Sequence, residues 1–289
     1  MVEATAERLG VQPFTKRGAS SKARMLQPRT SQRREARYRV VNQGCSMDSD
    51  PLEIPVQPIL FEHSLTHFAQ SLNDGQSKVI AIGSSTTAVE GNIVPYPGRL
   101  LQFLQSDYSA AIISMVNKGI GSQEAPAERD RFATDVIPAK PDLVIWQVGT
   151  NAIWQRRDSN PPPPSFNETT SAIREGLITL KAKTEADIIL MDLQYVPAVL
   201  TPTKKERALA MVDAISRLAR EANVNVFRRF AFMKGLIDVE SIPLDRMVDP
   251  LDNDRLHGSD WVTGRVAWAL QIAIADGVKK ARASMTTKR

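Results

Sequence analysis

Short apolar runs alternate with amphipathic helical stretches along most of the chain, from about residue 58 onward. The apolar runs have the length and β-branched content of buried strands, and they lie at 78–83, 110–116, 142–148, 187–193 and 224–227. The helical stretches lie at 58–72, 98–104, 127–137, 171–183, 204–222 and 261–279. Strands separated by helices indicate right-handed βαβ crossovers. The pattern predicts one α/β domain over 51–289, a three-layer flavodoxin-like arrangement with a parallel sheet of about five strands flanked by helices.

The charge of the chain is unevenly distributed between its amino-terminal segment and the predicted domain. The net charge is +5, but residues 1–46 hold ten basic and three acidic residues, so the remainder carries −2. A slightly acidic domain does not favour a nucleic-acid-binding core, despite the sequence pI near 9.4. No nucleic-acid partner is therefore expected for the domain.

Residues 1–50 lack the apolar periodicity of a folded segment and are predicted to form a disordered, basic N-terminal tail. A second interpretation stays open, in which translation starts at Met25 or Met47. No recognisable signal peptide is present, which favours a cytoplasmic protein, and no apolar run approaches the roughly 18 residues of a transmembrane segment. A single cysteine, Cys45, excludes a disulfide framework within the chain.

Polar clusters follow three of the predicted strands, and a fourth precedes the last helix. They are Gly83–Thr87, Asn117–Ser122, Gly149–Asn151 and Asp254–His257. Ligands of parallel sheets bind outside the carboxyl ends of the strands, so these clusters are expected to converge at one edge. Each cluster alone is equally typical of an ordinary turn.

Taken together in this order, the clusters resemble the SGNH, or GDSL-type, hydrolase family. The resemblance covers about 78–275, and the stretches Val144–Asn151, Met191–Tyr195 and Phe227–Phe230 look like a bacterial esterase branch of that family. It implies that Ser85 is the nucleophile and that Asp254 and His257 form the D-x-x-H pair. His257 is the only histidine besides His63 and His67, which lie in the first predicted helix.

The resemblance also implies an oxyanion hole made of the N–H groups of Ser85 and Ser122 and the side-chain amide of Asn151. Gly121 competes with Ser122 for the second position, because the family has glycine there. The chain departs from the family at Ser84, where Gly-Asp-Ser has aspartate, and at Ala152, where Gly-x-Asn-Asp has aspartate. Neither departure removes a group that would carry the chemistry.

A serine activated by histidine cleaves carboxylic esters through an acyl-enzyme and needs no metal or organic cofactor. The chain has no long apolar lid helix, which favours small-molecule or carbohydrate esters with short acyl groups, such as O-acetyl sugars. Trp154 and Gln194 are candidate substrate-binding residues. Three other functions stay open: an acyltransferase with the same triad, a catalytically inactive binding module, and an adaptor acting through the basic tail. His63 and His67 are taken as helix positions and not as a metal site, since no third ligand accompanies them.

Overall fold

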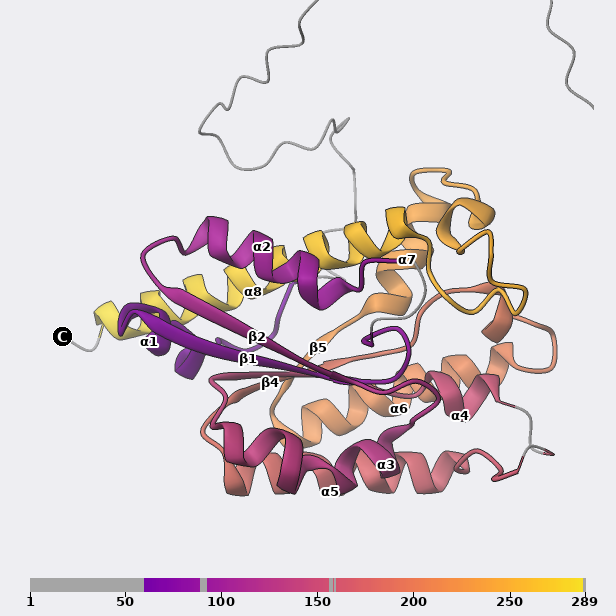
Figure 1. The fold of residues 1–289 in the computed structure, drawn as a ribbon, viewed down its shortest axis with the longest axis horizontal. Helices are drawn as coiled ribbons and strands as arrows, with labels where there is room; N and C mark the ends of the chain where they lie inside the picture. Colours follow the sequence, from indigo (N-terminus) through magenta and orange to yellow (C-terminus); the bar gives the residue numbers. More distant parts are fainter. Residues whose placement is uncertain (1–59, 89–92, 156–157, 159, 288–289) are drawn as a thin grey trace, which may run out of the picture. The chain divides into compact units, whose positions relative to one another are not determined.

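A parallel sheet forms the centre of the protein (Figure 1). The computed structural model describes residues 60–88, 93–155, 158 and 160–287. Within them the strands are β1 (Gln76–Gly83), β2 (Ile112–Gly119), β3 (Leu143–Gln147), β4 (Asp187–Met191) and β5 (Asn225–Phe227). They pair in the order β2-β1-β3-β4-β5, and every pairing is parallel. The prediction of an α/β domain with a sheet of about five parallel strands is confirmed.

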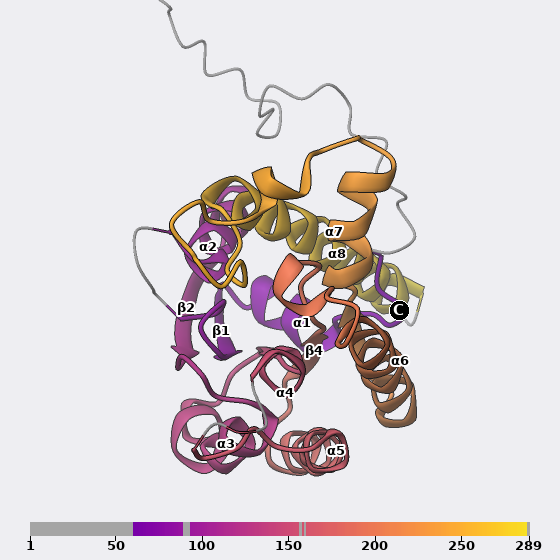
Figure 2. The same ribbon diagram turned by 90° about the vertical axis from the view of Figure 1, so that its right-hand side faces the viewer.

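Helices cover both faces of this sheet, which gives three layers (Figures 1 and 2). The helices are α1 (Thr66–Asn73), α2 (Tyr96–Asp107), α3 (Ala125–Asp130), α4 (Thr150–Trp154), α5 (Phe166–Lys183), α6 (Lys205–Ala222), α7 (Arg229–Asp238) and α8 (Asp260–Thr287). On one face α8 packs against α1, α2 and α7, and on the other α5 packs between α3 and α6. None of the helices in these described ranges is long and apolar enough to cross a membrane.

The core explains why the strands could be recognised as uninterrupted apolar runs. All residues of β3 are buried, because helices cover both sides of the strand. Trp146 is fully buried, and its ring meets Phe132 edge-on with centroids 4.9 Å apart. A Cβ added to Gly176 would lie 2.4 Å from the Trp146 ring, so only glycine lets α5 approach β3 this closely.

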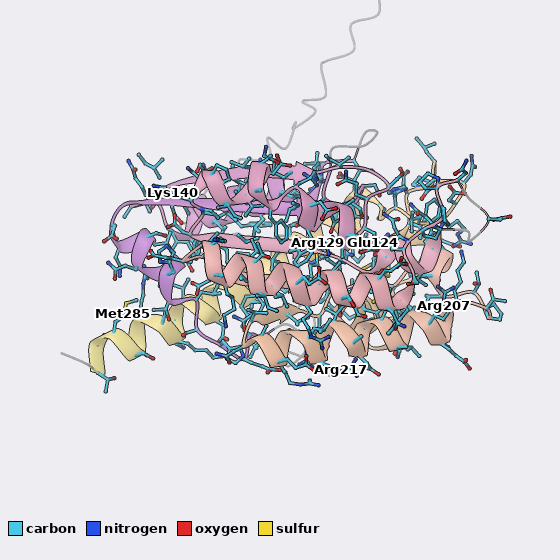
Figure 3. All side chains as sticks on the ribbon, turned by 90° about the horizontal axis from the view of Figure 1, so that it is seen from below. Glu124, Arg129, Lys140, Arg207, Arg217 and Met285 are labelled. Carbon is cyan, nitrogen blue, oxygen red and sulfur yellow. The ribbon has the colours of Figure 1, made fainter. Side chains whose placement is uncertain are left out.

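Charged side chains lie on the helices of the α3, α5 and α6 layer, the face seen in Figure 3. Arg129 pairs with Glu175 between α3 and α5, and Arg174 pairs with Glu221 between α5 and α6 at 2.8 Å. Exposed pairs of this kind contribute about 0–1 kcal/mol each. The packed core is therefore the main source of stability.

Several elements differ from the prediction. Helix α1 begins at Thr66, so His63 precedes it. The side chain of Asn225 accepts a hydrogen bond from the His63 N–H and donates one to the His63 carbonyl. The stretch predicted as one helix over 127–137 divides into α3, a π-helical turn and a 3₁₀ turn. Helices α4 and α7 were not predicted. The tail prediction for 1–50 falls outside the described residues.

Candidate active site

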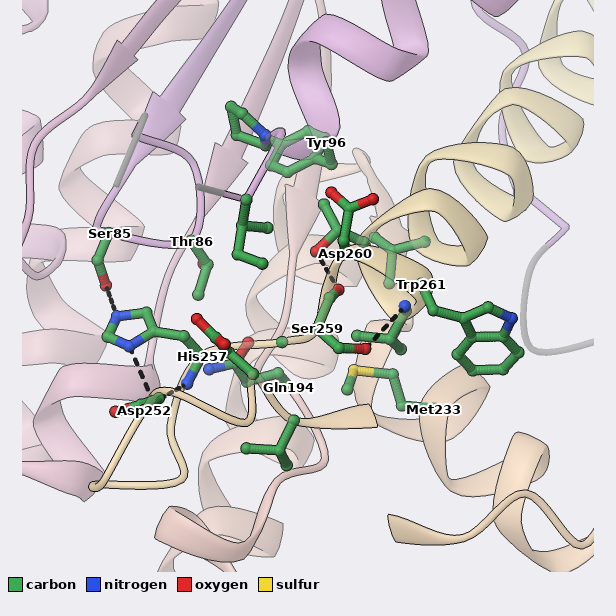
Figure 4. A pocket seen from close by; sticks show the side chains of 18 of the residues that line it. Ser85, Thr86, Tyr96, Gln194, Met233, Asp252, His257, Ser259, Asp260 and Trp261 are labelled. Atoms are coloured by element: carbon green, nitrogen blue, oxygen red, sulfur yellow. Dashed lines mark hydrogen bonds and ion pairs between the residues drawn. The ribbon is translucent and has the colours of Figure 1, made fainter. Parts of the chain in front are cut away.

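Ser85 lies in the turn that follows β1, at the carboxyl edge of the sheet (Figure 4). The turn is closed by the backbone N–H groups of Thr87 and Ala88, which both donate to the Ser84 carbonyl at 3.0 and 2.9 Å. The Ser85 hydroxyl oxygen lies 3.0 Å from Nε2 of His257. The serine and the histidine predicted from the sequence are therefore brought together from positions 172 residues apart.

Gln147, at the end of β3, anchors the turn that carries Ser85. Its carboxamide Oε1 accepts from the Ser84 N–H at 3.1 Å and from the hydroxyls of Ser84, Thr86 and Thr87 at 3.0, 2.9 and 3.3 Å. Gln147 is 1% exposed, so no water competes for this oxygen. Because the donors lie on both sides of Ser85, the position of the nucleophile depends on β3. The sequence analysis missed this residue.

Among the described residues, Asp252 and not Asp254 is the carboxylate that contacts His257. Oδ2 of Asp252 lies 3.0 Å from Nδ1 of the imidazole, on the side of the ring opposite Ser85. The Asp254 side chain is exposed, and its backbone N–H donates to Asp252 Oδ1 at 3.1 Å. The prediction of Asp254 as the partner of the histidine was wrong.

The turn between Asp252 and His257 gives the physical reason. Asp252 Oδ2 also accepts from the backbone N–H groups of Leu256 at 2.8 Å and His257 at 2.6 Å, which folds the turn around this carboxylate. Arg255 adopts a left-handed conformation, with φ 54°, that reverses the chain between Asp254 and His257. Burial raises the pKa of the Asp252 carboxyl, but these N–H bonds and the neighbouring imidazole hold it below its ordinary value. Asp252 is therefore an anion at neutral pH, as an orienting carboxylate must be.

Two of the predicted oxyanion residues lie close together: Ser122 in the loop after β2, and Asn151 at the start of α4. The Asn151 side-chain amide donates to the Gln123 carbonyl at 2.6 Å, and Gln155 Nε2 donates to the Ser122 carbonyl at 3.1 Å. An amide NH₂ has two hydrogens, so the bond to Gln123 orients Asn151 and uses one of them. Ser122 has a left-handed φ of 64°, a conformation that favours glycine. This backbone agrees with the expectation that the family's glycine corresponds to Ser122.

A buried glutamate fixes the start of α4, the helix that carries Asn151. Glu124 Oε1 accepts from the Gly149 N–H at 2.7 Å, and Oε2 accepts from the Ala152 N–H at 3.0 Å. Burial raises the pKa of Glu124, while the backbone N–H groups oppose that increase. The sequence analysis missed Glu124, although a carboxylate two residues after the second cluster is a detectable signal.

A buried pair of charged residues, Asp192 and Arg229, contacts the turn that carries Ser85. Arg229 donates from Nε to the Asp192 carbonyl at 3.0 Å and from Nη1 to the Thr86 hydroxyl at 3.3 Å. Asp192 Oδ1 accepts from the Phe230 N–H at 2.9 Å, which holds the start of α7. Burial raises the pKa of Asp192 to about 7 and lowers that of Arg229 to about 10. The pair ties β4 and α7 to the nucleophile turn.

A cavity of about 840 Å³ opens beside Ser85 and His257. Gln194 borders it, as predicted, and donates from Nε2 to the Leu256 carbonyl. Trp154 is not one of the described residues that border this cavity. Its side chain packs against the hydrophobic core, and its carbonyl accepts from Lys204 Nζ at 2.9 Å. The prediction of Trp154 as a substrate-binding residue is not supported by this position.

A serine, a histidine and a carboxylate joined in this order at the edge of an α/β sheet form the arrangement that serine hydrolases use on several unrelated folds. A comparison with protein families independently supports a hydrolase. The chain belongs to the Non-GDSL lipase-like family, whose model matches residues 52–280. Membership supports an esterase or lipase-like hydrolase, whereas the description Non-GDSL does not support the GDSL-type part of the resemblance.

Individual relatives agree with this class. The chain is 28% identical over 95 residues to an acetylxylan esterase of Geobacillus stearothermophilus, a match that spans 33% of this chain and 39% of that protein. The solved structure of Axe2, an acetylxylan esterase of the same organism, has a TM-score of 0.56 at 22% identity and covers 70% of this chain and 94% of its own. LAE5, an α/β hydrolase from the metagenome of Lake Arreo in Spain, has a TM-score of 0.58 at 19% identity, with coverages of 69% and 95%. The two structural matches show that the fold is shared.

Proposed function

We propose that this protein is a serine esterase of SGNH type, which cleaves carboxylic esters through an acyl group on Ser85. The observation that carries the proposal is the hydrogen-bonded row of Ser85, His257 and Asp252, with 3.0 Å between each pair of partners. A serine hydroxyl is a weak nucleophile until a base accepts its proton, and His257 Nε2 is in position to do so.

In the first half-reaction, Ser85 Oγ attacks the ester carbonyl while its proton passes to His257 Nε2. Asp252 holds the Nδ1–H tautomer and stabilises the imidazolium that forms. The carbonyl oxygen becomes an oxyanion, for which the Ser85 and Ser122 N–H groups and the Asn151 amide are the proposed donors. Gly121 remains the competing assignment for the second donor. Losing one such donor typically raises the barrier by about 2.7–4 kcal/mol.

The first half-reaction ends when the tetrahedral intermediate collapses and the alcohol leaves with the proton from His257. In the second half-reaction, water loses a proton to the same nitrogen and attacks the acyl carbonyl. The resulting intermediate collapses, the acid is released, and His257 returns the proton to Ser85 Oγ. The reaction is balanced as ester plus water giving acid plus alcohol. An acyltransferase would differ only in using a second alcohol in place of water.

The proposed alcohol is a carbohydrate. The support comes from the names of the relatives, which describe esterases that act on acetylxylan or on acetylated xylooligosaccharides. Structures of Axe2 with a substituted serine, aspartate or histidine are described as catalytic mutants, which supports the same three residue types here. In those variants the aspartate precedes the histidine by three residues, whereas Asp252 precedes His257 by five.

Acid release from p-nitrophenyl acetate and from acetylated xylooligosaccharides tests the proposal. We expect Ser85→Ala to lower kcat/KM by roughly 10⁴–10⁶ while folding is retained. Ser84→Ala is the matched control, since it removes a neighbouring hydroxyl and should keep substantial activity. Equal activity of wild type and Ser85→Ala would refute the proposal. Added glycerol distinguishes the two reaction types, because an acyltransferase would form glycerol ester in place of free acid.

A further inference from the structure

The cavity beside the catalytic serine is bordered mainly by hydrocarbon. Its apolar walls come from the segment before α2, from α7, from the loop before His257 and from the start of α8 (Figure 4). They include Ile93, Pro95, Met233, Val248, Val262 and Val266. Such a surface gains free energy when it covers apolar groups and removes them from water.

Three of the polar side chains at the border of this cavity are engaged with the protein. Ser259 Oγ donates to the Arg246 carbonyl at 2.7 Å, Thr86 Oγ1 donates to Gln147, and Gln194 Nε2 donates to the Leu256 carbonyl. A sugar ring has hydroxyl groups around its edge, and burying them without partners costs free energy. The walls therefore suit a hydrocarbon chain better than a carbohydrate.

An exposed apolar side chain also borders the cavity. Leu251 borders the cavity and is 78% exposed, next to Pro250 in the same loop. An apolar acyl chain that extends out of the cavity could therefore still contact the Leu251 side chain.

We infer that this cavity is the acyl subsite and takes an unbranched apolar acyl group of about six to ten carbons. The inference rests on the proposed function: with a carbohydrate as the alcohol, the acyl group is the part of the ester that the apolar walls can bind. A methylene occupies roughly the volume of a water molecule, about 30 Å³, so eight carbons fill on the order of 240 Å³, which the 840 Å³ cavity holds with space left for part of the alcohol. An acetyl group, at about 60 Å³, would contact much less of the apolar wall.

Two series of ester substrates, one with acyl groups of increasing length and one with alcohols of increasing length, test the inference directly. With p-nitrophenyl esters below their micelle concentrations, each methylene from acetyl to octanoyl should raise kcat/KM by about two- to four-fold. Acetyl and octanoyl differ by about six methylenes, so the total increase should be between about 60- and 4,000-fold. A second series of acetate esters, from ethyl to octyl, lengthens the alcohol and should change kcat/KM by less than about five-fold.

A substitution that fills the cavity should remove this preference. Ile93→Trp adds volume at a half-buried wall position, and it should lower octanoyl turnover at least ten-fold while acetyl turnover changes by less than three-fold. Val94→Trp is the control, because this neighbouring side chain is 49% exposed and is not among the described residues that border the cavity. Val266→Phe adds volume to the part of the wall that α8 forms, and it gives an independent second variant if Ile93→Trp misfolds.

The outcomes separate this inference from the proposed function. A flat acyl series, with turnover that still depends on Ser85, would overturn the acyl subsite and leave the esterase intact. A rise in the alcohol series without a rise in the acyl series would also overturn it, since the cavity would then hold the alcohol. Absence of Ser85-dependent turnover at every chain length would refute the proposed function itself.

Discussion

The pair Asp252→Asn and Asp254→Asn tests which carboxylate supports His257. Both changes replace a carboxylate by an amide of nearly the same shape, and the two positions lie in one turn. Asp252 Oδ2 is 3.0 Å from the imidazole Nδ1, whereas the Asp254 side chain is exposed. We expect Asp252→Asn to disable catalysis and Asp254→Asn to leave it nearly intact.

The size of the effect follows from the charge that forms during catalysis. When Ser85 attacks, His257 becomes a cation whose charge centre is about 4 Å from the Asp252 carboxylate, and such a pair attracts by about 4 kcal/mol at an effective dielectric constant of 20. That energy corresponds to about 10³ in rate. The one acceptor oxygen of asparagine can keep the N–H bonds from Leu256 and His257 but not also the bond from Asp254, so we expect kcat/KM to fall by about 10²–10³ with a small decrease in melting temperature.

The assay is kcat/KM for p-nitrophenyl acetate, with melting temperatures as the control for folding. The kcat/KM of Asp254→Asn should lie within about three-fold of the wild-type value, because the Asp254 side chain is exposed at the surface. A large loss in Asp254→Asn together with an active Asp252→Asn would refute the geometry of the turn. It would restore the three-residue spacing implied by the family resemblance.

Three further results are expected. Asn151→Ala should lower kcat by about 10²–10³ with a smaller change in KM, and a raised KM with unchanged kcat would instead assign this side chain to substrate binding. Gln147→Leu should leave buried donors unpaired, which should lower kcat at least ten-fold and the free energy of unfolding by about 1–3 kcal/mol. Gln147→Glu keeps an acceptor and should recover part of both losses. Equal kcat in wild type and both variants would exclude a positioning role for Gln147. Burial raises the pKa of Asp192 to about 7, so the folded protein is stabilised by keeping this carboxyl protonated. That stabilisation is complete below the pKa of an aspartate in the unfolded chain and is lost as the pH rises through 7. Unfolding by urea from pH 4 to 8 should therefore show wild type losing up to about 1.4 kcal/mol per pH unit relative to Asp192→Asn, and parallel curves would contradict this.

The sheet was predictable because its central strands are buried on both faces and so are continuous apolar runs. The missed helices have no comparable signal in the sequence. Helix α4 has only five residues, and α7 starts two residues after the end of β5, so no loop signal separates it from the strand. Helix α1 was predicted too early because the apolar residues before Thr66 pack on α8 without being helical. The Leu65 N–H donates to the Gly277 carbonyl at 3.0 Å.

The serine and the histidine of the site were predictable, whereas the carboxylate was not. Ser85 follows a buried strand, and His257 is the only histidine outside the segment around α1. Several aspartates precede His257, and the choice among them depends on the backbone of one turn, where Arg255 is left-handed. Gln147 and Glu124 were missed for a related reason: each acts on backbone or hydroxyl groups that only the folded chain brings within reach.

Fluorophosphonate labelling followed by peptide mapping tests the central claim most directly, because the probe reacts only with an activated serine. The account predicts one adduct, on Ser85, that is lost in His257→Ala and retained in Asp254→Asn. An adduct on Ser84 or Ser122, or a folded protein that resists the probe at all, would contradict the assignment of Ser85 as the nucleophile.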